Sequence, residues 1–115
     1  MFTVDQLIHS GLFTLVNEGE DTQREITVPF CCDLLSMAMG KAPAGCAWVT
    51  VMGNMNTLAV ASLTDAACVI LAEGCSLDEA AQAKAKVQGI TVLKTQLPIF
   101  AAALAIHQQL SEASL

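Results

Sequence analysis

The sequence has few charged residues and very few basic ones. Charged side chains make up 14% of the 115 residues, against roughly 25% in an ordinary globular domain. Five Lys and Arg stand against eleven Asp and Glu, the formal net charge is −6, and the basic residues are scattered along the chain. Nucleic acids and anionic membrane surfaces bind clustered positive charge. We therefore expect no nucleic-acid partner and no membrane partner.

The sequence also has no long uninterrupted apolar run. Its most apolar stretch, residues 58–72, is broken by Thr64 and Asp65. It is also shorter than the roughly 20 residues that a membrane-spanning helix needs. The residues Met1–Asp5 have neither the basic start nor the apolar run of a signal peptide. We therefore expect a soluble, cytoplasmic protein.

The cysteines do not have the spacing of a metal site. No pair forms the Cys-x-x-Cys motif that places two thiolates on one tetrahedral zinc, so no metal site is predicted. An odd number of cysteines without a leader sequence indicates free thiols in a reducing compartment. We expect them to act as small buried hydrophobic residues. They are Cys31, Cys32, Cys46, Cys68 and Cys75.

Apolar residues, by contrast, are abundant. They make up 54% of the 115 residues, and a chain of this length is expected to form a single domain, spanning residues 1–115. A domain of this size buries only roughly 60–70% of the surface that its unfolded chain exposes. The surplus predicts a buried subunit interface, most simply a homodimer, formed by the Ala-rich C-terminal helix or by the segment around Met52 and Met55. The abundance of alanine is the alternative explanation.

Helix and strand signals alternate along the chain. Helices are predicted for residues 4–10, 34–39, 57–63, 77–88 and 96–111. Strands are predicted for residues 13–16, 26–32, 47–52, 68–72 and 90–93. From Ile26 onward strand and helix alternate with short loops, which is typical of parallel strands joined by right-handed crossovers. The predicted fold is a small three-layer α/β/α domain with a mostly parallel sheet of about five strands.

Local signals mark the ends of these elements. Side chains that can cap a helix precede each predicted helix: Thr3, Asp33, Asn54 or Asn56, Ser76 and Thr95. Glycines that can end a helix follow three of them: Gly11, Gly40 and Gly89. Pro29 interrupts one predicted strand and places it at a sheet edge or a bend.

The motifs of common catalytic sites are missing. Gly40-Lys41-Ala42 lacks the hydroxyl residue that follows the lysine of a P-loop, and no Gly-x-Gly-x-x-Gly occurs. His9 and His107 lie on the first and last helices and are expected at the surface or in an interface. No carboxylates are paired for acid–base work. The sequence therefore predicts no catalytic residues and no cofactor.

The fold nevertheless indicates where a ligand could bind. In open parallel sheets, ligands bind at the carboxyl ends of the strands. The polar residues expected there are Asp33, Thr50, Asn54, Asn56, Glu73, Gly74 and Thr95. They could form a small-molecule site, or they could be only the caps and turns that such a fold requires.

Several short runs have a familiar order and spacing. They are Arg24-Glu25-Ile26-Thr27, Asp33-Leu34-Leu35-Ser36 with Met39-Gly40, Trp48-Val49-Thr50-Val51 with Asn54 and Asn56, Val69-Ile70-Leu71 with Glu73-Gly74, and Gly89-Ile90. In this pattern the chain resembles the DRTGG domain family over nearly its whole length. It departs from the family at Val28-Pro29, which stands where the name-giving Gly-Gly would be.

The resemblance implies a domain like the N-terminal domain of HPr kinase/phosphorylase, without the kinase domain. Such domains are regulatory or dimerisation modules. The expected function is therefore non-catalytic: a homodimeric regulatory module that binds a nucleotide-like or other small metabolite. The alternative is an assembly factor for a protein partner of redox (hydrogenase-type) or signalling function, and an enzyme is the least favoured interpretation.

Overall fold

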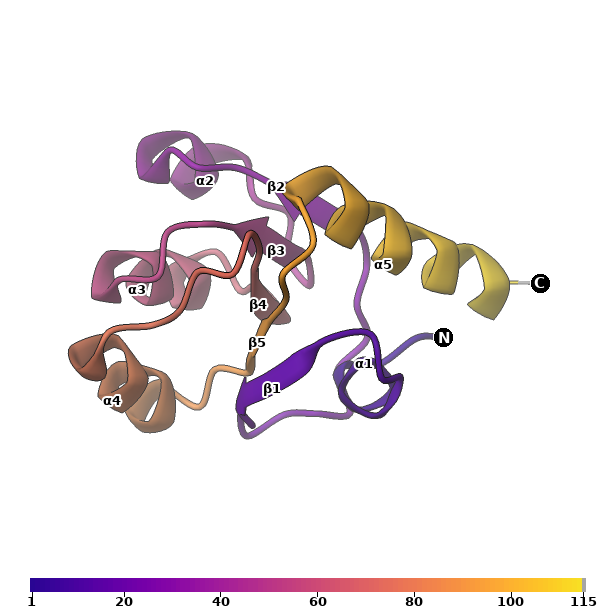
Figure 1. The fold of residues 1–115 in the computed structure, drawn as a ribbon, viewed down its shortest axis with the longest axis horizontal. Helices are drawn as coiled ribbons and strands as arrows, with labels where there is room; N and C mark the ends of the chain where they lie inside the picture. Colours follow the sequence, from indigo (N-terminus) through magenta and orange to yellow (C-terminus); the bar gives the residue numbers. More distant parts are fainter. Residues whose placement is uncertain (115) are drawn as a thin grey trace.

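A five-stranded sheet separates two layers of helices in the computed structural model, which describes residues 1–114 (Figure 1). The helices are α1 (Val4–His9), α2 (Leu35–Lys41), α3 (Met55–Leu63), α4 (Glu79–Gln88) and α5 (Ile99–Ala113). The strands are β1 (Thr14–Asn17), β2 (Pro29–Cys31), β3 (Ala47–Thr50), β4 (Cys68–Leu71) and β5 (Val92–Lys94).

The sheet is mostly parallel, as predicted. Its strand order is β1-β5-β4-β3-β2, and only β1 runs antiparallel to its neighbour. Helices α2, α3 and α4 cover one face, whereas α1 and α5 cover the other (Figure 1). The expected three-layer α/β/α architecture is therefore confirmed.

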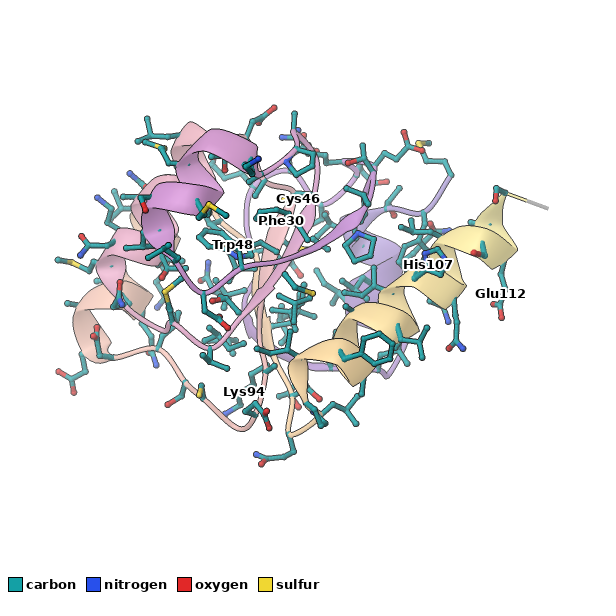
Figure 2. The ribbon with its side chains drawn as sticks, turned by 90° about the horizontal axis from the view of Figure 1, so that it is seen from above. Phe30, Cys46, Trp48, Lys94, His107 and Glu112 are labelled. Carbon is teal, nitrogen blue, oxygen red and sulfur yellow. The ribbon has the colours of Figure 1, made fainter. Side chains whose placement is uncertain are left out.

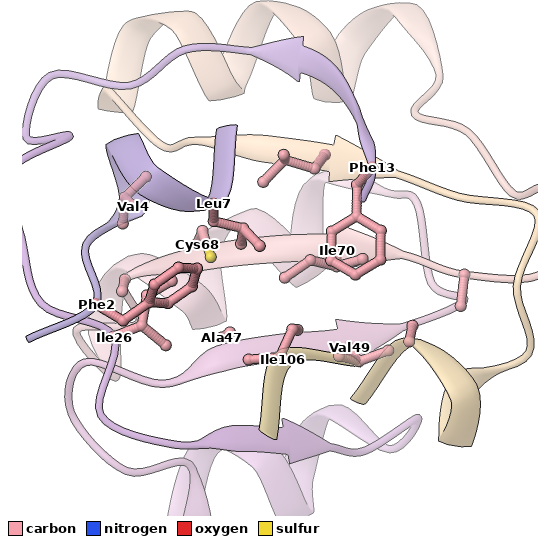
Figure 3. Packing of buried hydrophobic residues seen from close by; sticks show 14 residues of the cluster. Phe2, Val4, Leu7, Phe13, Ile26, Ala47, Val49, Cys68, Ile70 and Ile106 are labelled. Atoms are coloured by element: carbon pink, nitrogen blue, oxygen red, sulfur yellow. The ribbon is translucent and has the colours of Figure 1, made fainter. Parts of the chain in front are cut away.

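The two faces of the sheet carry separate apolar clusters. Every residue of β3 and β4 is buried because helices cover both sides of these central strands. Phe2, Leu7 and Ile106 pack on the α1–α5 side, as Figure 3 shows. The opposite face is centred on Trp48, whose indole Nε1 donates a hydrogen bond to the Cys32 carbonyl at 2.9 Å.

Three of the predicted helix caps are confirmed. Thr3 and Gln6 form the predicted capping box on α1. Of the two candidates for α3, Asn54 is the cap, because its side chain accepts hydrogen bonds from the backbone at Asn56 and Thr57. Gly89 ends α4 in the left-handed conformation, with φ of 65°.

Two predicted caps on the later helices are wrong. Asp78, not Ser76, caps α4, and its carboxylate accepts from the Ala81 N–H at 2.8 Å. Asp78 has an extended backbone and donates its N–H to the Gly53 carbonyl at 3.3 Å, and the helix starts two residues later than predicted. Thr95 does not cap α5, because its hydroxyl accepts from the Leu97 N–H in a turn and the helix starts after Pro98.

The prediction for α2 is also wrong at both ends. Asp33 does not cap this helix; the capping position is Leu34, which offers no side-chain hydrogen bond. The Asp33 carboxylate is instead bonded to Thr50. Gly40 does not end the helix, because α2 continues to Lys41.

Strand β2 is shorter than the predicted strand 26–32. Ile26 donates its N–H to Phe2, and Thr27 donates to Gly45, so the segment before Pro29 is held by the N-terminus and by a loop. Pro29 begins the strand, which lies at the sheet edge as predicted.

None of the helices described in residues 1–114 is both long enough and apolar enough to cross a membrane.

Candidate functional site

The predicted site residues all lie at, or shortly after, the carboxyl ends of the parallel strands. Asp33 follows β2, and Thr50 is the last residue of β3. Asn54 and Asn56 begin α3, Glu73 and Gly74 follow β4, and Thr95 follows β5. Strands β2, β3, β4 and β5 are neighbours in this order and all run parallel, so their carboxyl ends lie side by side. Their hydrogen bonds determine whether they remain available to a ligand.

Asp33 and Thr50 form a link between two strand ends. The buried Thr50 hydroxyl donates to the Asp33 carboxylate at 2.8 Å, and the Val51 N–H donates to the same oxygen at 3.1 Å. The Thr50 hydroxyl in turn accepts from the Met52 N–H at 3.2 Å. Both side chains are therefore engaged in holding the β2 end against the loop after β3.

The loop before α3 leaves little open space. Asn54 uses its side-chain oxygen as the cap. A Cβ atom at Gly53 would lie 2.2 Å from the Ser76 carbonyl oxygen, so glycine is required for the chains to approach this closely. Asn56 is exposed and its side chain is not used as the cap, so it is freer to meet a ligand than Asn54.

Glu73 and Gly74 are fastened to the loop after β5. The Glu73 N–H donates to the Leu97 carbonyl and the Gly74 N–H donates to the Thr95 carbonyl, both at 2.9 Å. Glu73 has φ of 60°, which is unfavourable for a residue with a side chain. Its side chain is exposed, so the carboxylate can contact a ligand although the backbone N–H is hydrogen-bonded to Leu97.

One buried hydroxyl at this edge lacks a partner, and no pattern in the sequence pointed to it. Thr57 is fully buried in the first turn of α3. Its Oγ1 is the one buried side-chain N or O atom in residues 1–114 with no hydrogen bond. A buried hydroxyl in this state costs about 1–3 kcal/mol.

The environments of Cys31, Cys46 and Cys68 work against a nucleophilic role for these three thiols. Burial raises the pKa of Cys46 to about 11 and that of Cys68 still further. Partial burial also raises the pKa of Cys31, and the nearby Asp33 adds to the effect. A catalytic thiol needs a lowered pKa. The expectation of buried cysteines holds for Cys46 and Cys68, whereas Cys31 is exposed.

The described cavities lie away from the predicted edge. A groove of about 540 Å³ runs between α5 and the segment Glu25–Pro29. A smaller cavity of about 160 Å³ adjoins the ion pair of Arg24 and Asp65. Within residues 1–114 no group of three His, Cys, Asp or Glu side chains is arranged to hold a metal ion.

Helix α5 carries apolar side chains on its outer face as well as on its inner face. Ala102 and Ile106 are buried against the sheet. On the outside, Phe100 is 75% exposed and Leu104 is 40% exposed. The sequence has no Asp, Glu, Lys or Arg between Lys94 and Glu112. A helical segment that is apolar all round, as residues 99–106 are, normally lies in a protein interior or an interface.

His107 and Glu112 mark the two flanks of this helix. Figure 2 shows His107 on one side of α5 and Glu112 on the other. His107 lines the 540 Å³ groove together with Leu110, whereas Glu112 lines a separate shallow depression beside α1. Both histidines are exposed, as expected, and they lie on different helices.

No protein-family model matches the chain, and no curated protein is significantly similar to it.

Proposed function

We propose that this chain is a non-catalytic regulatory module that acts by self-association. The observation that carries the proposal is the exposed, uncharged outer face of α5, with Phe100 three-quarters exposed. Phe100 and Leu104 are neighbours at i and i+4 on this face, and contiguous exposed apolar surface marks interaction sites on soluble domains. The strand-end residues Asp33, Thr50 and Asn54 already bond within the domain, so they are less available for chemistry.

The resemblance to DRTGG domains supports the same proposal. Domains of that family are regulatory or dimerisation modules, and we propose that this chain is related to them. The five cysteines are unpaired, which fits a reducing cytoplasm as the proposed location. An assembly role toward a redox or signalling protein would use the same apolar surface and is a variant of this proposal.

Sedimentation velocity over a range of concentrations tests the proposal. The 12.1 kDa chain should sediment faster as its concentration rises through the micromolar range. Association should persist in high salt, because the α5 surface is apolar and screening weakens only charged contacts. A monomer at every concentration up to about a millimolar, a Kd limit equivalent to roughly 4 kcal/mol, would refute self-association.

A second candidate function is the binding of a small metabolite at the strand ends. It is favoured by the unpartnered Thr57 hydroxyl, which a bound polar group at the start of α3 could satisfy. The exposed side chains of Asn56 and Glu73 lie at the same edge. Nucleotides and other small metabolites should then raise the melting temperature of the native chain.

A matched variant makes this second test specific. Thr57→Val removes the hydroxyl while keeping the shape, so it should abolish the ligand-induced rise in melting temperature and stabilise the free protein. The control Thr64→Val changes a hydroxyl at the other end of α3, which already donates to the Val60 carbonyl, and it should leave the ligand-induced rise unchanged. No rise with any compound at millimolar concentration would exclude this candidate.

A further inference from the structure

The exposed apolar residues of α5 and the 540 Å³ groove lie along one face of the helix. Residues separated alternately by four and three positions share a helix face. Phe100, Leu104, His107, Ser111 and Ser114 have this spacing. The first two residues are exposed and apolar, and the last three line the groove. We call this face the α5 stripe. Phe100 and Leu104 form its protruding half, and His107, Ser111 and Ser114 form its hollow half.

The hollow half of the α5 stripe is built to receive an apolar side chain. Its walls include the apolar side chains of Phe2, Ile26, Val28 and Leu110. Val28 is 38% exposed. The ionisable side chains at the groove are Glu25 and His107. A volume of about 540 Å³ leaves room for an aromatic ring and its neighbours.

The spacing of the two halves matches a two-fold axis. Phe100 and Ser111 are separated by eleven residues, which is about 16 Å along a helix. If two α5 helices pack antiparallel about an axis between residues 105 and 106, residue 100 of each meets residue 111 of the other. Leu104 then meets His107 in the same way. The protruding half of each copy thus faces the hollow half of the other copy.

We propose that two copies of this chain pair through antiparallel α5 stripes, with each Phe100 seated in the groove of the other copy. The inference rests on the self-association proposed above and specifies its geometry. It commits to a second copy because protrusion and groove occur on one surface, at the separation that an isologous contact needs. A single foreign partner would have to match both halves separately.

Charge favours the same face. The protein carries a net charge of −6, so two copies repel each other over most of their surfaces. Four of the five residues of the α5 stripe lie within the stretch between Lys94 and Glu112, which contains no Asp, Glu, Lys or Arg, and the fifth, Ser114, follows Glu112. Two copies can therefore approach through this surface without bringing acidic side chains of the helix together.

The available area indicates a dimer of moderate strength. Phe100 alone offers on the order of 120–150 Å² of its ring and side chain. Leu104 and Val28 are 40% and 38% exposed, and Met1, beside the groove, is 73% exposed. Stable interfaces bury roughly 800 Å² per partner. The α5 stripe and the groove walls supply a large part of this area, so a micromolar Kd is expected.

Strand addition at the nearby sheet edge is a less favourable way to dimerise. The Val28 carbonyl accepts from the Ala47 N–H, so the backbone polar groups of Val28 point toward β3. The alternation of a strand then turns Pro29 to the outer edge, where it has no N–H to donate. With only three residues, β2 offers a partner strand few hydrogen bonds.

A charge-complementation experiment tests the antiparallel arrangement. Phe100→Lys and Ser111→Glu each place a charge in the apolar contact, so each should raise the dimer Kd at least about tenfold. The double variant brings the introduced lysine of one copy next to the introduced glutamate of the other, twice, and should recover affinity by a few-fold. The measurement is sedimentation equilibrium at low salt. Position 100 is exposed and position 111 lies at the surface, so the variants should fold, as circular dichroism checks.

A matched control separates this inference from the self-association on which it rests. Val87→Lys changes an apolar side chain that is 84% exposed on α4, in the other helix layer, and should leave the Kd unchanged. A normal Kd for Phe100→Lys would overturn the α5 pairing while self-association stands. A double variant no better than the single variants would overturn the antiparallel geometry. A native chain that never dimerises would overturn both proposals.

Discussion

The Thr50 hydroxyl donates a 2.8 Å hydrogen bond to the Asp33 carboxylate and so joins the end of β3 to the residues that follow β2. Thr50 is fully buried, whereas Asp33 is exposed. The same carboxylate oxygen accepts from the Val51 N–H. A residue that could have been read as a helix cap or a ligand contact is thus a link between neighbouring strand ends.

The first prediction concerns this link. Thr50→Val removes the donor at nearly constant volume and should lower the free energy of unfolding by about 1–2 kcal/mol, because a partly buried hydrogen bond to a carboxylate is lost. Urea unfolding followed by the fluorescence of Trp48, the one tryptophan, measures the change at fixed protein concentration.

A double-mutant cycle with Asp33→Ala completes this test. The two substitutions should be coupled by at least about 0.5 kcal/mol because the residues are in direct contact. Additive effects would mean that Asp33 does not depend on Thr50, and they would return Asp33 to the set of residues free for a ligand.

The second prediction concerns the close approach of two loops. Gly53→Ala places a Cβ atom 2.2 Å from the Ser76 carbonyl oxygen, so backbone must move and stability should fall by more than about 2 kcal/mol. Gly40→Ala is the matched control, because a Cβ atom there meets nothing within 4 Å. As an exposed helical position, it should gain about 0.5–1 kcal/mol. Equal effects at both glycines would contradict the packing of these loops.

The third prediction distinguishes two candidate caps of α4. Asp78→Ala should cost about 1 kcal/mol, because the Asp78 carboxylate accepts from the Ala81 N–H at the start of the helix. Ser76→Ala should be nearly neutral, since Ser76 lies outside the helix and makes no cap bond. Urea midpoints of the two variants decide between them. The opposite ranking would place the helix start at Ser76.

The fourth prediction concerns the acid limb of the stability curve. Asp65 accepts two hydrogen bonds from the Arg24 guanidinium, at 2.5 and 2.8 Å, and these bonds lower the pKa of Asp65 below its usual value of 3.8. The lowered pKa stabilises the fold above that value, and this contribution is lost as the pH falls below about 4. The side chain of Asp65 is 65% exposed, so the contribution is at most about 1 kcal/mol.

The variant Asp65→Asn tests this ion pair. Asparagine tolerates the φ of 63° found at this position. The substitution should lower stability at pH 7 and flatten the loss of stability between about pH 5 and pH 3. Asp21→Asn is the control, because Asp21 acts on Arg24 only through its charge and accepts no bond from it. An unchanged pH profile for Asp65→Asn would show that the pair does not stabilise the fold.

Much of the fold could be predicted because strand and helix signals are local. The apolar run Cys68–Leu71 became the buried central strand β4, and Gly89 ended α4 as the pattern indicated. The parallel direction of the strands could be predicted because strands and helices alternate with short loops between them. The errors occurred where a polar side chain had more than one partner within reach. Asp33 bonded to Thr50 instead of capping α2, and Asp78 instead of Ser76 bonded to the first turn of α4.

The candidate surface could be predicted only in part. The composition indicated that apolar surface would remain unburied, and the Ala-rich last helix was one place expected for it. The sequence could not show which side of α5 would face the sheet, because its first two turns are apolar all round. Nor could it reveal the unpartnered Thr57 hydroxyl, whose burial depends on distant elements.

By itself, the sequence determined the alternation of strands and helices, the capping of α1 by Thr3 and the lack of Asp, Glu, Lys and Arg over residues 99–111 of α5. Each of these depends on neighbours only a few residues apart. Only the tertiary structure decided that Asp33 would bond to Thr50 and that Leu110 would line a groove with Val28 and Phe2. These contacts join residues far apart in the chain. They exist because sheet pairing and burial, which act over the whole domain, bring those residues together.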